Sequence, residues 1–317
     1  MKLDEYSVAK TNQFLFYGTS NIKQDAEDYI FQRCFTQKET RQHNIRCHSM
    51  DLMTLLAIFC LLMVAVAFSP LGLGGGILYV PIMHYMLDWE IKEAIVASLT
   101  LVLMVSLGSS LAHSKSGHAE HKVAKWGRIA AVPSATTGVL LSGVLLSLVG
   151  DVGIKIIAAL VITFVLERTI RKSATQDDEY SEEKLLEKRN QYLTGSSFAG
   201  IAAGILGIGG GAILVTLNRS MLKMDAKKAA GTSYLVAATI VPVALVSHLL
   251  INQNLDIIVD NSGITAMILV PLMVFSSAFF GAKYAIKYLP KHIVTGVFIF
   301  VVSVSLFRYI IDFYSLI

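Results

Sequence analysis

The stretch Gly72-Leu73-Gly74-Gly75-Gly76 interrupts a long apolar segment, and Gly207-Ile208-Gly209-Gly210-Gly211 repeats the pattern 135 positions later. The same spacing of 135 pairs Ser98 with Ser233 and His113 with His248. Farther along, the spacing becomes 138, which matches Pro133 with Pro271 and Gly143 with Gly281 and indicates a small insertion. So many matches in one register predict two homologous halves. Two interrupted apolar segments in corresponding positions are typical of transporters whose broken helices meet at a site inside the membrane.

The composition places the chain in a membrane. Of its 317 residues, 54% are hydrophobic and only 16% are charged, whereas soluble domains carry roughly a quarter charged residues. The apolar residues form blocks of about 18 to 25, long enough to cross a bilayer as helices. We therefore expect a multi-pass membrane protein. The net charge of +4 fits basic cytoplasmic loops, and the chain has no soluble basic domain for nucleic acid.

The pattern of apolar blocks predicts four regions. Residues 1–51 form a polar tail. This tail is either a poorly ordered segment or, in the interpretation that we favour, a mis-called start whose true initiator is Met50 or Met53. The first transmembrane repeat covers 52–170, a charged cytoplasmic linker covers 171–192, and the second repeat covers 193–313. Each repeat holds five apolar segments, and each glycine run lies between the first two of them.

Basic residues indicate how the glycine runs are placed. If each run lay within one continuous crossing, lysine and arginine would divide almost evenly between the two sides of the membrane. If each run is instead the tip of a helical hairpin, seventeen basic residues after the tail fall on one side. Only Lys92, Lys155 and Arg308 then fall on the other. Membrane proteins keep lysine and arginine in cytoplasmic loops, so the hairpin arrangement is favoured.

The expected fold is therefore an all-α polytopic membrane protein built from two inverted repeats. Each repeat is a hairpin with a glycine-rich tip followed by three transmembrane helices. The number of segments per repeat is odd, so the two copies insert upside down relative to each other. The protein has about eight spans if each hairpin counts as one.

The tips predict an anion site. The first N–H groups of a helix have no partner within the helix, carry partial positive charge and bind anions. Glycine leaves these groups unshielded. We expect the two tips to hold an anion near the middle of the membrane, with hydroxyls one segment later completing the shell. The predicted binding residues are Gly74, Gly75, Gly76, Ser98, Gly209, Gly210, Gly211, Thr232 and Ser233. The alternative is that these glycines and hydroxyls only pack helices or bond to backbone.

Two matched histidines, His113 and His248, are candidates for carrying a coupling proton, because the pKa of histidine lies near neutral pH. Interfacial packing is the competing interpretation. A histidine-metal membrane enzyme using His113, His118 and His121 is a rival function, although only His113 has a counterpart in the second half. A sensor or assembly subunit that binds without transporting is a third. The sequence has no nucleotide-binding loop, and we expect no cofactor, no metal and no catalytic residue.

The residues around both tips resemble the TauE/SafE family of sulfite and organosulfonate exporters. The resemblance rests on the run from Pro70 to Pro81 and on Glu93 to Leu99. In the second half it rests on Gly204 to Gly211, Ala229 to Ser233, and Gly281 to Pro290, and in all it covers about 52–313. Two departures are Thr216-Leu217-Asn218 after the second tip and Ala97 before Ser98.

This resemblance implies a secondary transporter of the cell (inner) membrane that moves small sulfur-containing anions, such as sulfite or organosulfonates. It implies export from the cytoplasm, and rocking of one inverted half against the other would alternate access. The partners are then a small anion and the lipid bilayer. Another small anion as substrate stays open, as do the coupling ion and a homo-oligomeric state.

Overall fold

The computed structural model describes residues 52–173, 182–252 and 255–288, together with Pro290 and short pieces between 296 and 311. The predicted tail 1–51, the middle of the predicted linker and most of the last predicted segment, 292–313, lie outside these residues. The chain divides into two units, Met1–Leu55 and Leu56–Ile317. Apart from the first residues of the helix Leu52–Phe68, every element below belongs to the second unit.

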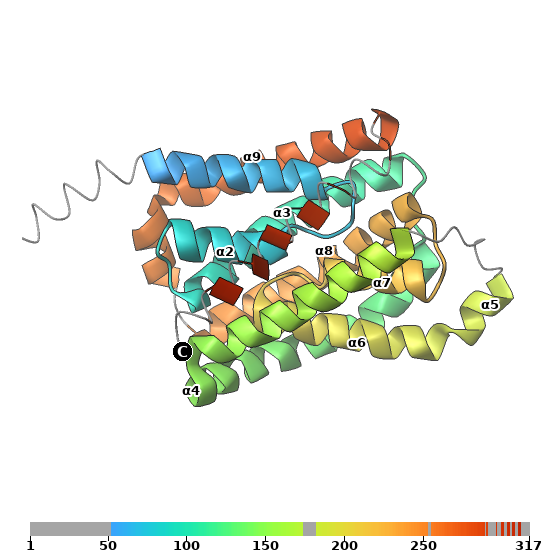
Figure 1. The fold of residues 1–317 in the computed structure, drawn as a ribbon, viewed down its shortest axis with the longest axis horizontal. Coiled ribbons are helices and arrows are strands. Elements are labelled where there is room, and N and C mark those ends of the chain that lie inside the picture. Colours follow the sequence, from blue (N-terminus) through green and yellow to red (C-terminus); the bar gives the residue numbers. More distant parts are fainter. Residues whose placement is uncertain are drawn as a thin grey trace, which may run out of the picture. The chain divides into compact units, whose positions relative to one another are not determined.

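The described residues fold into helices (Figure 1). After the helix Leu52–Phe68, α2 covers Gly76–Met86 and α3 covers Ile91–Lys115. Helix α4, His121–Ser173, is interrupted at Gly150, where φ is 64° and ψ is −162°. The second half contains the short α5 (Glu182–Glu187), α6 (Arg189–Leu206), α7 (Gly211–Ser220) and α8 (Ala226–Asn252). Helix α9, Leu255–Tyr288, is interrupted at Gly263.

Four of the described helices are long and apolar enough to cross a membrane: Ile91–Lys115, His121–Gly150, Ala226–Ile251 and Ser262–Tyr288. Their outward side chains are apolar as well. Leu148 is 76% exposed and Ile264 is 68% exposed. Exposed apolar side chains suit contact with lipid, where there is no water to form hydrogen bonds with polar groups. The prediction of an all-helical, polytopic membrane protein is confirmed.

The second glycine run lies between two antiparallel helices. A Cβ at Gly195, early in α6, would lie 2.8 Å from Leu217 near the end of α7. A Cβ at Gly210, just before α7, would lie 2.8 Å from the carbonyl oxygen of Ala199 in the second half of α6. The two helices therefore run in opposite directions, and the glycines lie where the chain turns. The chain also turns back between the helix Leu52–Phe68 and α2 (Figure 1). We call these pairs of helices the second and the first hairpin.

Helices from the two halves pack against each other through small residues. A Cβ at Gly200 of α6 would lie 2.9 Å from the carbonyl carbon of Ala131 in α4, and one at Gly204 would lie 2.7 Å from the backbone nitrogen of Val139. In the same way, Gly108 of α3 lies against the backbone of Phe275 in α9. Close approach at small residues is the usual way in which helices associate in membranes. The two halves thus share one interior.

Candidate functional site

The two glycine runs adopt the same backbone conformation in the same register. In the first tip (residues 72–76), φ is 82° at Gly72, 78° at Gly74 and 81° at Gly75. In the second tip (residues 207–211), the corresponding values are 68° at Gly207, 70° at Gly209 and 69° at Gly210. Residues with a Cβ rarely adopt this left-handed region, which explains why the three positions are glycine in both copies.

The tips lie against each other. A Cβ at Gly76 would lie 2.5 Å from the Cα of Ile208, and one at Gly211 would lie 2.8 Å from the carbonyl oxygen of Gly72. Each contact joins the beginning of a helix in one half to the glycine turn of the other half. The predicted glycines are therefore brought together, as the anion-site hypothesis requires.

The two matched serines exchange partners across the tips. The Ser98 hydroxyl, on α3, donates to the carbonyl oxygen of Gly207 at 2.9 Å. The Ser233 hydroxyl, on α8, donates to the carbonyl oxygen of Gly72 at 2.8 Å. All four groups are buried. A serine of each half thus holds the glycine tip of the other half, and the sequence alone gave no indication of these partners.

Thr232 has a different environment from the neighbouring Ser233. Its hydroxyl accepts from the backbone N–H of Glu120 at 2.9 Å and donates to the carbonyl oxygen of Lys228 at 2.7 Å. It therefore fastens the 116–120 loop to α8, next to Gly231, whose missing side chain admits the His118 carbonyl oxygen. At the same place, Lys228 forms an ion pair with Glu120 at 3.7 Å.

The matched histidines bind the carbonyl ends of the helices that precede the tips. The Nε2 of His113 donates to the Ser69 carbonyl oxygen at 3.3 Å, and the Nε2 of His248 donates to the Gly204 carbonyl oxygen at 2.7 Å. Ser69 and Gly204 are themselves 135 positions apart. Both rings are buried, so each histidine fixes the helix that leads into its own tip.

No group of three or more His, Cys, Asp and Glu residues in the described part of the chain is arranged to hold a metal ion. His113 is buried beneath the first tip, and His118 and His121 are only partly buried or exposed. Nothing in this region therefore adds support to the histidine-metal enzyme.

Several backbone N–H groups at the tips have no hydrogen-bond partner among the described residues. They belong to Gly75, Gly76 and Ile77 at the start of α2 and to residues 211–213 at the start of α7. In contrast, the N–H of Gly74 donates to the Tyr234 hydroxyl at 3.4 Å. Unpaired groups of this kind are the helix ends that attract anions.

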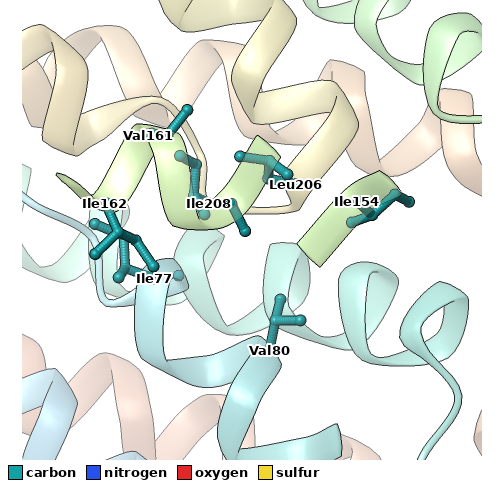
Figure 2. A pocket seen from close by; sticks show the side chains of 9 residues that line it. Ile77, Val80, Ile154, Val161, Ile162, Leu206 and Ile208 are labelled. Atoms are coloured by element: carbon teal, nitrogen blue, oxygen red, sulfur yellow. The ribbon is translucent and has the colours of Figure 1, made fainter. Parts of the chain in front are cut away.

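One pocket adjoins the start of α2. It is lined by Gly76, Ile77 and Val80 of α2, by Leu206 and Ile208 at the second tip, and by Ile154, Ala158, Val161 and Ile162 of α4. Figure 2 shows that the labelled side chains around it consist of carbon only. The polar groups at this pocket are therefore backbone groups, and no lining side chain carries a charge. We call it the tip pocket.

Two tyrosines beside the first tip were missed by sequence reasoning. The Tyr234 hydroxyl donates to the Phe68 carbonyl oxygen at 2.7 Å, and the Tyr79 ring lies over Gly75. Their counterparts in the other half are Leu99 and Leu214. The sequence does distinguish these tyrosines, because each one differs from its counterpart in a repeat where the other site residues match.

Residues 56–309, well over half of the chain, match the family described as sulfite exporter TauE/SafE. The chain belongs to the TauE/SafE family. The matching region contains both tips, both serines and both histidines, and the resemblance seen in the sequence is confirmed. TauE/SafE proteins are membrane transporters, so the general class of the protein is a membrane transporter. The comparisons with curated proteins and with solved structures gave no match.

Proposed function

We propose that this protein is a secondary transporter that exports small sulfur-containing anions, sulfite or organosulfonates, across the inner cell membrane by alternating access. The two tips together form the binding site near the middle of the membrane. The proposal combines the TauE/SafE family match with the backbone arrangement of residues 72–76 and 207–211.

The observation that carries the proposal is the tip pocket at the start of α2. It places the N–H groups of Gly76 and Ile77, which have no partner in the described part of the chain, beside an apolar space. Partial positive charge on such groups is strongest where little water screens it. A site of backbone dipoles attracts a small anion without a fixed countercharge, so the anion is also able to leave. Binding followed by release is what a transporter requires.

The charge distribution supports the orientation. Lys115 ends α3 and Arg189 begins α6, and both belong to the side that collects seventeen basic residues. We assign this side to the cytoplasm. Lys155 belongs to the opposite side, where its ammonium group lies 5.6 Å from the centre of the Tyr85 ring.

The experiment is a flux assay in proteoliposomes with sulfite, sulfoacetate, taurine and sulfate, with and without a pH gradient. The test variant combines Gly75→Val with Gly210→Val, because a side chain at either position covers the start of a helix and has an unfavourable φ. Gly143→Val is the matched control, since a Cβ there meets nothing within 4 Å.

We expect flux of a sulfur-containing anion in the wild type and in the control, and loss of flux in the double variant. Size-exclusion profiles identify a variant that fails to fold. Substrate binding to the folded wild type without any flux would contradict transport. Full flux through the double variant would contradict the tip site.

A further inference from the structure

The polar side chains around the two tips are distributed unequally. Tyr79 and Tyr234 lie beside the first tip, and Ser106 and Ser109 lie on α3, which packs against it. In the other half, the residues that correspond to Tyr79, Ser106, Ser109 and Tyr234 are Leu214, Val241, Ala244 and Leu99. The backbone and the holding serines are nevertheless the same in both tips. The two halves therefore share a scaffold but differ in the chemistry that surrounds each tip.

Tyr79 lies directly at the start of α2. A Cβ at Gly75 would lie 2.8 Å from the Cζ of the Tyr79 ring and 3.0 Å from its hydroxyl oxygen, so the hydroxyl reaches back to the first turn of its own helix. Side chains in helices normally point toward the N-terminus in this way. Tyr79 is fully buried, and its hydroxyl has no hydrogen-bond partner in the described part of the chain.

Ser106 lies on α3, one turn beyond a residue that packs against the first tip. A Cβ at Gly74 would lie 3.2 Å from Val102, one turn before Ser106 on the same face of α3. One turn after Ser106, the Ser109 hydroxyl lies beside that of Tyr234, which accepts from the Gly74 N–H. The Ser106 hydroxyl is fully buried and also has no partner among the described residues.

The unpaired Tyr79 hydroxyl thus borders a helix start with unpaired N–H groups, and the unpaired Ser106 hydroxyl lies on the neighbouring helix α3. Buried hydroxyls are normally hydrogen-bonded, and leaving them unpaired costs stability. A leucine or valine, as in the second half, would avoid this cost. Both hydroxyls can donate a hydrogen bond, as the free N–H groups do. The arrangement is complementary to a ligand that accepts several hydrogen bonds at once.

We propose that the first tip is the primary oxyanion site, in which Tyr79 and Ser106 donate to sulfite or sulfonate oxygens held at the start of α2. The second tip, with leucine and valine in these positions, contributes only apolar side chains to the shared site. This assignment rests on the proposed transport function and adds to it the side chains that select the substrate. A sulfur atom with three oxygens accepts from several donors in different directions, whereas a halide lacks such directed acceptors.

The test uses Tyr79→Phe and Ser106→Ala, each of which removes only a hydroxyl oxygen. Tyr284→Phe and Ser147→Ala are matched controls on exposed positions. We would measure the KM for uptake of sulfite and of methanesulfonate into proteoliposomes, together with the melting temperature of each purified protein. Because a hydrogen bond to a charged group is strong, its loss in Tyr79→Phe should raise the KM roughly tenfold or more. Ser106→Ala should also raise the KM. The KM of each control variant should stay within about twofold of the wild-type value, a much smaller change than the loss of such a bond would cause.

The melting temperature separates binding from a structural role. Because the Tyr79 hydroxyl has no partner in the protein, its removal should leave the melting temperature unchanged or raise it. A lower melting temperature, failure to fold or an unchanged KM in Tyr79→Phe would each overturn the assignment. If the wild type transports neither anion, the transport function itself fails. If it transports them and Tyr79→Phe does so with the same KM, only the assignment to the first tip fails.

Discussion

The exchange of serines across the tips predicts a measurable loss of stability. In Ser98→Ala, the carbonyl oxygen of Gly207 loses the hydroxyl that donates to it at 2.9 Å. Both residues are buried, so no water replaces the lost donor. A buried acceptor left without its donor costs about 1–3 kcal/mol. In chains of 150–250 residues, each kcal/mol lowers the melting temperature by about 2–4 °C, so we expect a decrease of roughly 2–12 °C.

Ser233→Ala should have a similar effect, because the Ser233 hydroxyl donates to the Gly72 carbonyl oxygen at 2.8 Å. Its second contact, with the Ala230 carbonyl oxygen in its own helix, adds little. The two sites are coupled, since Gly72 also packs against the start of α7 at Gly211. Releasing one tip therefore weakens the support of the other, and the double variant should lose less than the sum of the single losses.

The assay is thermal unfolding of the purified protein in detergent, followed by the intrinsic fluorescence of its tryptophans. Ser147→Ala is the control, because its hydroxyl is exposed and donates only to Val144 in its own helix. It should change stability by no more than about 0.5 kcal/mol. If Ser98→Ala melts at the same temperature as Ser147→Ala, the hydroxyl does not hold the opposite tip and the reasoning is refuted.

Three further predictions concern other parts of the site. Gly72→Ala should prevent stable folding, because φ is 82° and the Cβ would lie 2.6 Å from the Cα of Ala230; monodisperse wild-type levels by fluorescence size exclusion would contradict this. His248→Ala should lower stability by about 1–3 kcal/mol in thermal unfolding, because it removes the donor to a buried carbonyl; an unchanged melting temperature would count against the contact. Ala158→Leu should fill part of the tip pocket and reduce sulfite flux several-fold, whereas Gly143→Leu should not; equal flux in proteoliposomes would exclude the pocket from the pathway.

The repeat register predicted which residues adopt the same conformation, because matching positions of a duplication occupy matching places in the fold. Gly75 and Gly210, for example, were singled out together and have nearly the same φ. The register could not predict which half supplies a partner. Ser98 was expected at an anion, yet its hydroxyl donates to a glycine carbonyl of the opposite half. Sequence similarity between two halves carries no information about whether they pack side by side or interleave.

The missed tyrosines have a different explanation. A search for matching residues passes over Tyr79 because its counterpart is Leu214, and over Tyr234 because its counterpart is Leu99. In addition, the sequence of an apolar helix does not distinguish a functional tyrosine from an ordinary core residue. Only the placement of the hydroxyl beside Gly75 distinguishes Tyr79 from a packing side chain. In the proposed site, the matching residues therefore form the scaffold, and the mismatched residues are the ones that we assign to the substrate.

The interleaved packing also bears on how access could alternate. Rocking one half against the other as rigid bodies would break both serine–carbonyl bonds at once. It would also slide α6 along α4, where Gly200 and Gly204 bring the two backbones into close contact. Movement of one tip needs only one of these bonds to open and leaves the α4–α6 contact intact. Since close-packed interiors resist gradual deformation, the smaller rearrangement costs less. If the protein works by alternating access, as we propose, the packing therefore favours tips that open one at a time over halves that rock as units.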